Sequence, residues 1–549
     1  MSLAEKIKVN TEYTRSINIE RDVDSVSVVN AYIPTTRALE TLSKIGKTIT
    51  SKSDMPRSWM LMGPYGSGKS SFAIFLSHLV GIEGDAATIC AQSKVKEIRE
   101  EVPNYLGGTQ GSFEHCRVLL TGSPEPLSKR LAYALRCGAE RYFAQKPGEH
   151  SVIDELECLQ EKSQIGTSEI IAGVTSLQEA IALEGGGHGL IIVIDELGKF
   201  LEYEARHSDA NDIFLLQALS EQAYKGSENG SVAILSLFVL LHQSFDQYAR
   251  HLGKAQQNEW AKVQGRFEVV PFVENTEQTL RIVGKVIEQP KKISKIVTDR
   301  IQQMIGVLGE ARALPHSLKK TTAKELFKNC YPLHPVSALL LPLLCQKVAQ
   351  NERTLFNYLG SHEKHGFIES LNRLKDFGDW IYPCEIYDYF VSNQSAAVVD
   401  HLTHRRWAEV VTALERLDVE GDESANLLKT IGLLNIVGAQ AGLKASKEIL
   451  ELCLDEPASL STLLSELGEQ SVVQLRKFNN EYRVWQGSDF NLEEQLQNQR
   501  GNFSVFSLAD YLNSQYQAKP IVARKFTIHL FKPSEQLLVW KVRLLQVPL

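Results

Sequence analysis

The sequence predicts an α/β protein: a mainly parallel, helix-covered sheet, then a helical lid and a mostly α region. Three observations support this class. Apolar, strand-like runs alternate with amphipathic helical stretches up to about residue 274. A glycine-rich loop separates one such strand from the following helix, and beyond residue 275 the pattern is mostly helical. The alternation favours a parallel sheet, because each crossover between parallel strands needs a helix-sized connection.

Five apolar runs are expected to form the sheet, and the intervening segments are expected to be helical. The strand candidates are 59–62, 115–121, 190–195, 231–241 and 266–272. The helix candidates are 34–49, 71–80, 126–143 and much of 151–183. From 275 to 360 the helical pattern has breaks at Pro290 and Pro315.

The loop after the first strand reads Gly-Pro-Tyr-Gly-Ser-Gly-Lys-Ser over residues 63–70, the phosphate-binding pattern G-x-x-x-x-G-K-[ST]. Glycines let backbone N–H groups turn inward around phosphate oxygens, and the helix N-terminus adds its dipole. Lys69 is expected to reach the β- and γ-phosphates of ATP, and Ser70 to offer its hydroxyl to Mg²⁺. The expected nucleotide-binding residues are Gly63, Pro64, Tyr65, Gly66, Ser67, Gly68, Lys69, Ser70 and Ser71. The alternative is a glycine-rich turn that binds nothing.

A second apolar run, 190–194, ends in the acids Asp195 and Glu196. Ligands of open α/β sheets sit at the carboxyl ends of the strands. Asp195 is therefore the candidate Mg²⁺ carboxylate, the Walker-B aspartate, and Glu196 the candidate general base for the attacking water. The alternative is a strand that ends at two surface acids. With the phosphate loop upstream, the pair favours nucleotide hydrolysis.

The strand ending at Leu241 runs into His242 and Gln243. A polar side chain at that tip is placed to touch the γ-phosphate or the water that attacks it. The alternative, a helix cap or another satisfied polar group, has equal weight.

Composition narrows the function classes. The net charge is −7, so any contact with nucleic acid would need a local basic patch. The eight cysteines form no C-x-x-C pair, which argues against zinc, iron–sulfur or disulfide roles. The first 20 residues are polar, and no apolar run approaches the length of a membrane span. Cytoplasmic localisation is the expectation.

These features resemble AAA+ ATPases of the origin-recognition/STAND branch. Several strings also look like the large ATP-binding proteins of bacterial phage-defence systems, including the BREX-type ATPases. The resemblance covers roughly residues 30–490, and those strings are 195–202, 241–245, 264–267, 351–356 and 482–489. It implies ATP hydrolysis coupled to a conformational change in a defence or DNA-transaction complex.

The resemblance also assigns roles to single residues. His242 or Gln243 takes the sensor-1 position, and Arg266 resembles an arginine finger, which neutralises charge on the transferred phosphoryl group. Arg353 matches a sensor-2 arginine on the lid. The alternatives are a surface arginine in an ion pair for Arg266 and a solvated helix face for Arg353. A finger that acts in trans requires a homo-oligomer.

The expected domains are an N-terminal arm (1–30), the ATPase core (31–274), the lid (275–365), a helical, winged-helix-like domain (366–500) and a C-terminal tail (501–549). Within the fourth, segments 448–456, 460–467 and 471–477 read as helices and 481–485 as a strand. A winged helix has that order and often contacts DNA, yet its basic residues are mixed with acids, so protein contact is an equal alternative. The alternatives to a motor or switch are a nucleotide-dependent assembly scaffold and an origin-recognition-like DNA loader.

Overall fold

We describe a computed structural model of the 549-residue chain. The chain divides into two units, Met1–Gln486 and Gly487–Leu549, and every described residue belongs to the first. The expected C-terminal tail therefore lies outside the described residues. These are 2–13, 17–49, 51, 53–99, 114–144, 146–184, 189–207, 212–226, 231–290, 293–315, 318–348, 355–392, 401–417, 423–438 and 442–485.

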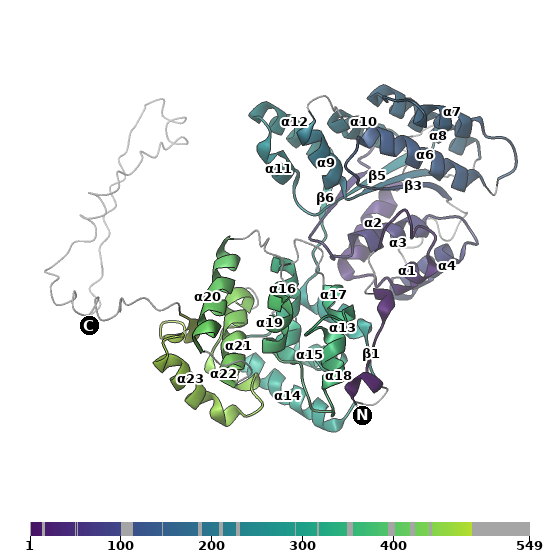
Figure 1. Ribbon diagram of the computed structural model, residues 1–549. Helices are drawn as coiled ribbons and strands as arrows, with labels where there is room; N and C mark the ends of the chain where they lie inside the picture. The colour runs from purple at the N-terminus through teal and green to yellow at the C-terminus, as the bar shows by residue number, and fades with distance from the viewer. Residues whose placement is uncertain are drawn as a thin grey trace, which may run out of the picture. The chain divides into compact units, whose positions relative to one another are not determined.

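A five-stranded sheet lies at the centre of the N-terminal half, and all of its strand pairs are parallel (Figure 1). The strand order confirms the predicted α/β class, with a phosphate-loop strand, β2, inside the sheet. β5 lies between β2 and the acidic strand β4. In spatial order the strands are β3 (His115–Thr121), β4 (Gly189–Asp195), β5 (Ile234–Leu241), β2 (Ser58–Met62) and β6 (Glu268–Pro271).

Helices cover both faces of this sheet (Figure 1). Successive side chains of a strand point to opposite faces, so Trp59 and Leu61 join one core while Met60 joins the other. The first face carries α1 (Val26–Ala31), α2 (Thr36–Ile49), α3 (Lys69–Leu79) and α4 (Ala86–Ile98). The second carries α6 (Leu127–Phe143), α7 (Ser151–Gln160), α8 (Thr167–Leu183), α9 (Leu197–Arg206), α10 (Asp212–Tyr224), α11 (Phe245–Tyr248) and α12 (Lys254–Gln264).

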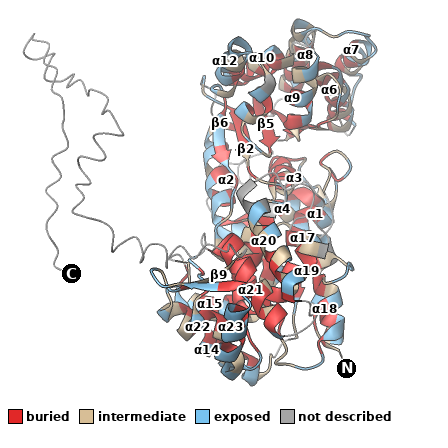
Figure 2. Ribbon diagram, turned by 60° about the vertical axis from the view of Figure 1, so that its left-hand side comes forward, coloured by how far each residue is buried: buried red, intermediate tan, exposed pale blue. Residues whose placement is uncertain are grey.

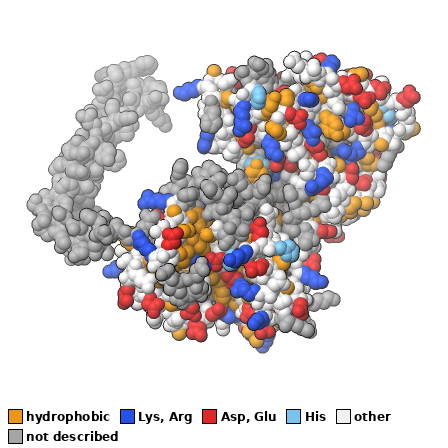
Figure 3. All heavy atoms as spheres, in the orientation of Figure 1, with side chains coloured by type: hydrophobic (Ala, Val, Ile, Leu, Met, Phe, Trp, Pro, Cys, Tyr) orange, Lys and Arg blue, Asp and Glu red, His pale blue; other side chains and the backbone are white. Residues whose placement is uncertain are grey.

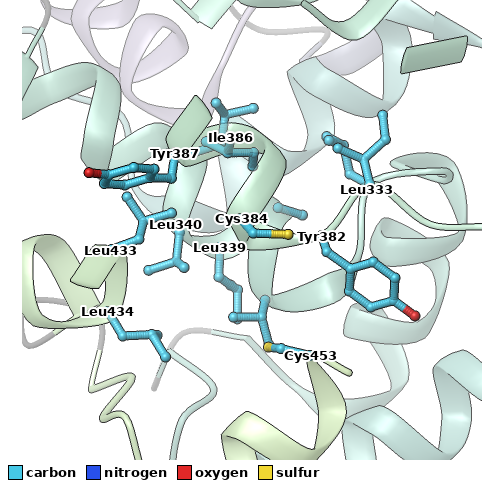
Figure 4. Packing of buried hydrophobic residues seen from close by; sticks show 14 of the residues in the cluster. Leu333, Leu339, Leu340, Tyr382, Cys384, Ile386, Tyr387, Leu433, Leu434 and Cys453 are labelled. Carbon is cyan, nitrogen blue, oxygen red and sulfur yellow. The ribbon is translucent and has the colours of Figure 1, made fainter. Parts of the chain in front are cut away.

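The following region is built from helices around one apolar core, which Figure 4 shows between Leu339, Tyr387 and Leu433. Its buried residues appear red in Figure 2. The helices are α13 (Thr276–Val286), α14 (Lys295–Glu310), α15 (Lys320–Asn329), α16 (Pro335–Val348), α17 (Leu355–Gly360), α18 (Phe367–Arg373), α19 (Pro383–Ser392), α20 (His401–Leu417) and α21 (Glu423–Val437). The predicted breaks at Pro290 and Pro315 fall between helices.

The first 30 residues contribute more than an arm. Strand β1 (Lys8–Val9) pairs antiparallel with β7 (Ile287–Glu288), and Leu3 is buried in the helical core. Further along, Ile19 and Val29 are buried against the sheet. Apolar side chains in a segment that is polar overall therefore attach it to the helical core and to the core on the first face of the sheet.

The segment after α21 corrects one expectation. Helices α22 (Lys447–Leu452) and α23 (Leu460–Glu469) form, but residues 471–477 are not a third helix there. Ser471 adopts a positive φ of 56°, and Val473–Arg476 forms β8, paired antiparallel with β9 (Glu481–Val484). A chain reversal after α23 thus starts a hairpin. The order of α21, α22, α23 and this hairpin keeps the winged-helix assignment as a prediction.

Among the described residues, we find no helix with the length and apolar character needed to cross a membrane.

Candidate nucleotide-binding site

The loop between β2 and α3 has the backbone geometry that phosphate binding requires. Gly66 and Gly68 have positive φ values of 71° and 84°, which residues with a Cβ rarely adopt. A Cβ on Gly63 would lie 2.3 Å from the carbonyl oxygen of Phe272. The loop leads into the N-terminus of α3, where free N–H groups and the helix dipole favour an anion.

Lys69, the first residue of α3, is only 4% exposed. Its ammonium donates to the carbonyl oxygens of Gly63 at 2.6 Å and Pro64 at 2.9 Å. Burial lowers the pKa of Lys69 to about 8, although the charges of Asp195 and Glu196 act in the opposite direction. A buried ammonium that is held by loop carbonyls can exchange them for phosphate oxygens.

Asp195 ends β4 and is 3% exposed. Burial raises the pKa of its carboxyl group, while hydrogen bonds from the Ser70 side chain and the Glu196 backbone N–H lower it. The structure thus joins the two predicted Mg²⁺ ligands. A buried carboxylate beside a hydroxyl suits a small divalent cation, because Mg²⁺ prefers oxygen ligands and uses one or two carboxylates. Ser70 and Asp195 would hold the ion.

Glu196 directly follows β4 and adopts a left-handed backbone conformation, with φ 50° and ψ 40°. Such a conformation is uncommon for a residue other than glycine. The Glu196 carboxylate forms an ion pair with Lys199 in the first turn of α9. Sequence reasoning missed Lys199, although the spacing of three residues on a helix was the available signal.

His242 lies at the tip of β5, and its Nδ1 is 3.4 Å from the Lys69 ammonium. Its ring stacks on the Tyr65 ring of the phosphate loop. Burial, together with the charges of Lys69 and Lys199, lowers the pKa of His242 to about 3. Its buried Nε2 has no hydrogen-bond partner among the described residues. The neighbouring Gln243 is exposed and hydrogen-bonds with Tyr248. Of the two sensor candidates, the structure therefore brings His242 to Lys69.

Arg266 is not part of this cluster. It lies just before β6, whose Glu268 is in register with Trp59 near the start of β2, whereas the phosphate loop follows Met62. At ~3.3 Å per residue, Glu268 lies roughly 13 Å from Gly63 along the strand direction, and Arg266 precedes Glu268 in the chain. Its guanidinium pairs with Glu221 of α10 at 3.0 Å. The other predicted arginine, Arg353, lies outside the described residues.

The remaining loop residues lie where the motif places them. The Ser67 hydroxyl is 3.3 Å from the Lys69 ammonium, and Ser71 belongs to the first turn of α3. The site therefore gathers one ammonium, one buried carboxylate, one partly buried carboxylate and one neutral imidazole at the carboxyl edge of the sheet.

Comparisons with known proteins identify no family for the chain. No family model matches it, and no curated protein does. The solved structures that match include the Aeropyrum pernix ORC2 protein in ADPNP–ADP complexes, with 11% identity and a TM-score of 0.33, covering 90% of this chain and 98% of that one. The ADP form of the same protein has 12% identity and a TM-score of 0.28, covering 91% of this chain and 100% of that one. Because these scores are low, any function has to be inferred from the residues of the chain itself.

Proposed function

We propose that the chain binds MgATP and hydrolyses it to ADP and phosphate, as an AAA+-type motor or switch. One observation carries the proposal: a phosphate-loop backbone presents a buried Lys69, and the Ser70 hydroxyl hydrogen-bonds to Asp195. Asp195 ends β4, which is the second strand from β2 in the same sheet. A turn without a ligand would not require a buried ammonium and a buried carboxylate side by side. Burying two such charges is costly unless their partners or a ligand compensate for the loss of hydration.

In this proposal each residue of the site has a separate task. The loop N–H groups and Lys69 bind the β- and γ-phosphates, and Ser70 and Asp195 would hold Mg²⁺, which would supply positive charge there. Glu196 accepts a proton from the attacking water as its oxygen bonds to the γ-phosphorus. The bond from that phosphorus to the bridging oxygen breaks, and ADP leaves. His242, neutral near pH 7, is placed to hydrogen-bond the γ-phosphate through a ring N–H.

Glu196→Gln tests the assignment of the general base. We expect this variant to bind MgATP like the wild type, because the phosphate cradle is unchanged. Its turnover should fall about 10²- to 10⁴-fold, because the water loses its proton acceptor. A fluorescent ATP analogue measures the affinity, and release of inorganic phosphate measures the turnover. Hydrolysis by the variant at the wild-type rate would remove Glu196 from the mechanism.

We further propose that the chain works as a homo-oligomer, in which Arg266 completes the site of a second copy. The distance of Arg266 from its own phosphate loop supports action in trans. Arg266→Ala should lower turnover by about 10²-fold or more and leave ATP affinity nearly unchanged. Mixing this variant with Glu196→Gln should restore part of the activity, because each supplies the group that the other lacks. No recovery in assembled mixtures would contradict the trans arrangement.

A nucleotide-dependent assembly scaffold is the second candidate. The observation in its favour is the Glu196–Lys199 ion pair, which engages the proposed base. A scaffold would change its oligomeric state with ATP while turnover stays negligible. Size-exclusion chromatography with and without MgATP, run beside the phosphate-release measurement, separates the two.

The resemblance of the sequence to BREX-type ATPases supports a role in a bacterial anti-phage defence complex. Genes for a nuclease, helicase or methyltransferase beside this one would support that role, and replication genes would favour a DNA loader. DNA is a candidate partner through the β8–β9 hairpin, which carries Arg476 and Lys477. However, α23 contains no basic residue and exposes Glu466 and Glu469, and charges of both signs are interspersed on the face in Figure 3. A binding titration over salt tests DNA contact, because phosphate contacts give a steep negative slope.

A further inference from the structure

We propose that Lys199 is a positioning residue, which draws the Glu196 carboxylate toward a resting position and so competes with the position in which Glu196 activates water. The inference rests on the proposed ATPase function and adds a restraint on its base. The Lys199 ammonium and the Glu196 carboxylate form an ion pair within one turn, three residues apart. In this position one carboxylate oxygen is engaged by Lys199, which makes the carboxylate less available to the attacking water.

The backbone of Glu196 is fixed, so its side chain is the part that can move. The Gly122 N–H donates to the Asp195 carbonyl oxygen at 2.8 Å. A Cβ on Gly122 would lie only 2.1 Å from the Glu196 carbonyl oxygen, which shows how tightly the segments after β3 and β4 pack. The left-handed φ of Glu196 also has to be maintained by its surroundings. A switch between a resting and a working position therefore requires only side-chain rotation.

The charges around Glu196 explain why bound nucleotide would leave the pair with Lys199 as the main restraint on its carboxylate. The Lys69 ammonium lies 3.4 Å from His242 Nδ1, and the charge of Lys199 also acts on His242. The Glu196 carboxylate acts on Lys69 and pairs with Lys199. A bound triphosphate attracts the Lys69 ammonium because it carries more negative charge than one carboxylate, and the exposed pair with Lys199 then remains as the restraint on Glu196. Glu196 would turn toward the attacking water in the part of the bound population in which that pair is open.

The exposure of the pair sets the size of the effect. The Lys199 side chain is 50% exposed and that of Glu196 is 27% exposed. Ion pairs that face solvent are weak, so Lys199 restrains the base without locking it. We therefore expect its removal to raise the basal kcat by about two- to fivefold.

The test uses the full chain with Lys199→Met and Lys199→Arg. Lys199→Met keeps most of the apolar stem but removes the charge, and Lys199→Arg keeps the pair. Steady-state phosphate release gives kcat and KM, and a fluorescent ATP analogue gives Kd. The matched control is Lys262→Met, because Lys262 forms the same kind of pair with Glu259, three residues away on α12. We expect kcat to rise in Lys199→Met alone, with Kd unchanged in all three variants.

A double variant shows whether the effect passes through Glu196. Adding Lys199→Met to Glu196→Gln should leave the residual rate unchanged, since no base remains to be released. A kcat in Lys199→Met at or below the wild-type value would overturn the proposal, as would an equal rise in Lys199→Arg or a rise that persists without Glu196. A wild-type chain that neither binds nor hydrolyses ATP would instead overturn the proposed function itself.

Discussion

A buried cation lies in the chain before strand β2 and another lies after it, and the two differ in the groups that surround them. Arg57 precedes the strand and is 0% exposed, while Lys69 follows the phosphate loop and is 4% exposed. The Arg57 guanidinium donates to backbone carbonyl oxygens near the C-termini of α2 and α10. The acceptors belong to Thr48, Ser51, Ser53, Met55, Ala223, Tyr224 and Lys225.

The difference separates a structural cation from a binding cation. Carbonyls near helix C-termini carry partial negative charge and lack helical partners, so Arg57 satisfies groups that would otherwise be orphaned. Lys69 instead has two carbonyls of its own loop, one hydroxyl and a neutral imidazole around it. The loss of hydration outweighs the nearby charges of Asp195 and Glu196, as the lowered pKa of Lys69 indicates, so a phosphate ligand would add the missing compensation.

Replacing Arg57 should produce the largest effect. Arg57→Met removes a buried guanidinium that has many acceptors, and those carbonyl groups, of which that of Ala223 is buried, lose its N–H donors. We expect the free energy of unfolding to fall by about 3–5 kcal/mol, measured by urea denaturation. The control is Arg266→Met, an exposed arginine for which we expect a change of about 0.5 kcal/mol or less. Equal stability of the two variants would mean that the hydrogen bonds from Arg57 to these carbonyl groups contribute little to the free energy of unfolding.

Replacing Lys69 should have the opposite pattern. Lys69→Met should weaken ATP binding by about 10²-fold or more, because charge-assisted hydrogen bonds to phosphate are lost. The same change should leave the free energy of unfolding unchanged or increase it, since a buried ammonium carries a cost of dehydration. Calorimetric titration with MgATP and urea denaturation provide the two readouts. A strongly destabilised Lys69→Met would show that the ammonium is structural, like Arg57.

Local sequence patterns predicted the parts of this comparison that depend on neighbours in the chain. The phosphate loop, the strand ending at Asp195 and the tip at His242 each followed from a strand and the residues directly after it. Because parallel strands end at a common edge, their convergence also followed. The helix expected over 471–477 was wrong, because the turn that begins at Ser471 with positive φ replaced helical continuation by strand pairing.

Contacts over long sequence separations could not be predicted in this way. Arg57 hydrogen-bonds to carbonyl groups at the end of α10, more than 160 positions later in the sequence. No residue pattern near Arg57 predicts that contact. The stacking of Tyr65 on His242 likewise depends on how β2 and β5 pair. Arg266 illustrates a different limit, since the role that we propose for it depends on a second copy of the chain.

The pH dependence of binding gives the smallest effect, and it applies only to Lys69. Its pKa of about 8 means that the free site loses its ammonium as the pH rises through 8, whereas bound phosphates would hold the proton. ATP affinity should therefore be constant near pH 7 and weaken above pH 8, by at most about tenfold per pH unit.

The contribution of Lys69 to the free energy of unfolding changes with pH in the opposite direction. Between about pH 8 and the unfolded value of 10.5, the unfolded chain binds more protons at this residue, so its contribution to stability rises with pH. Lys69→Met should lose both trends, and wild-type affinity that is equal at pH 7 and pH 9.5 would show that Lys69 keeps its ammonium in the free site.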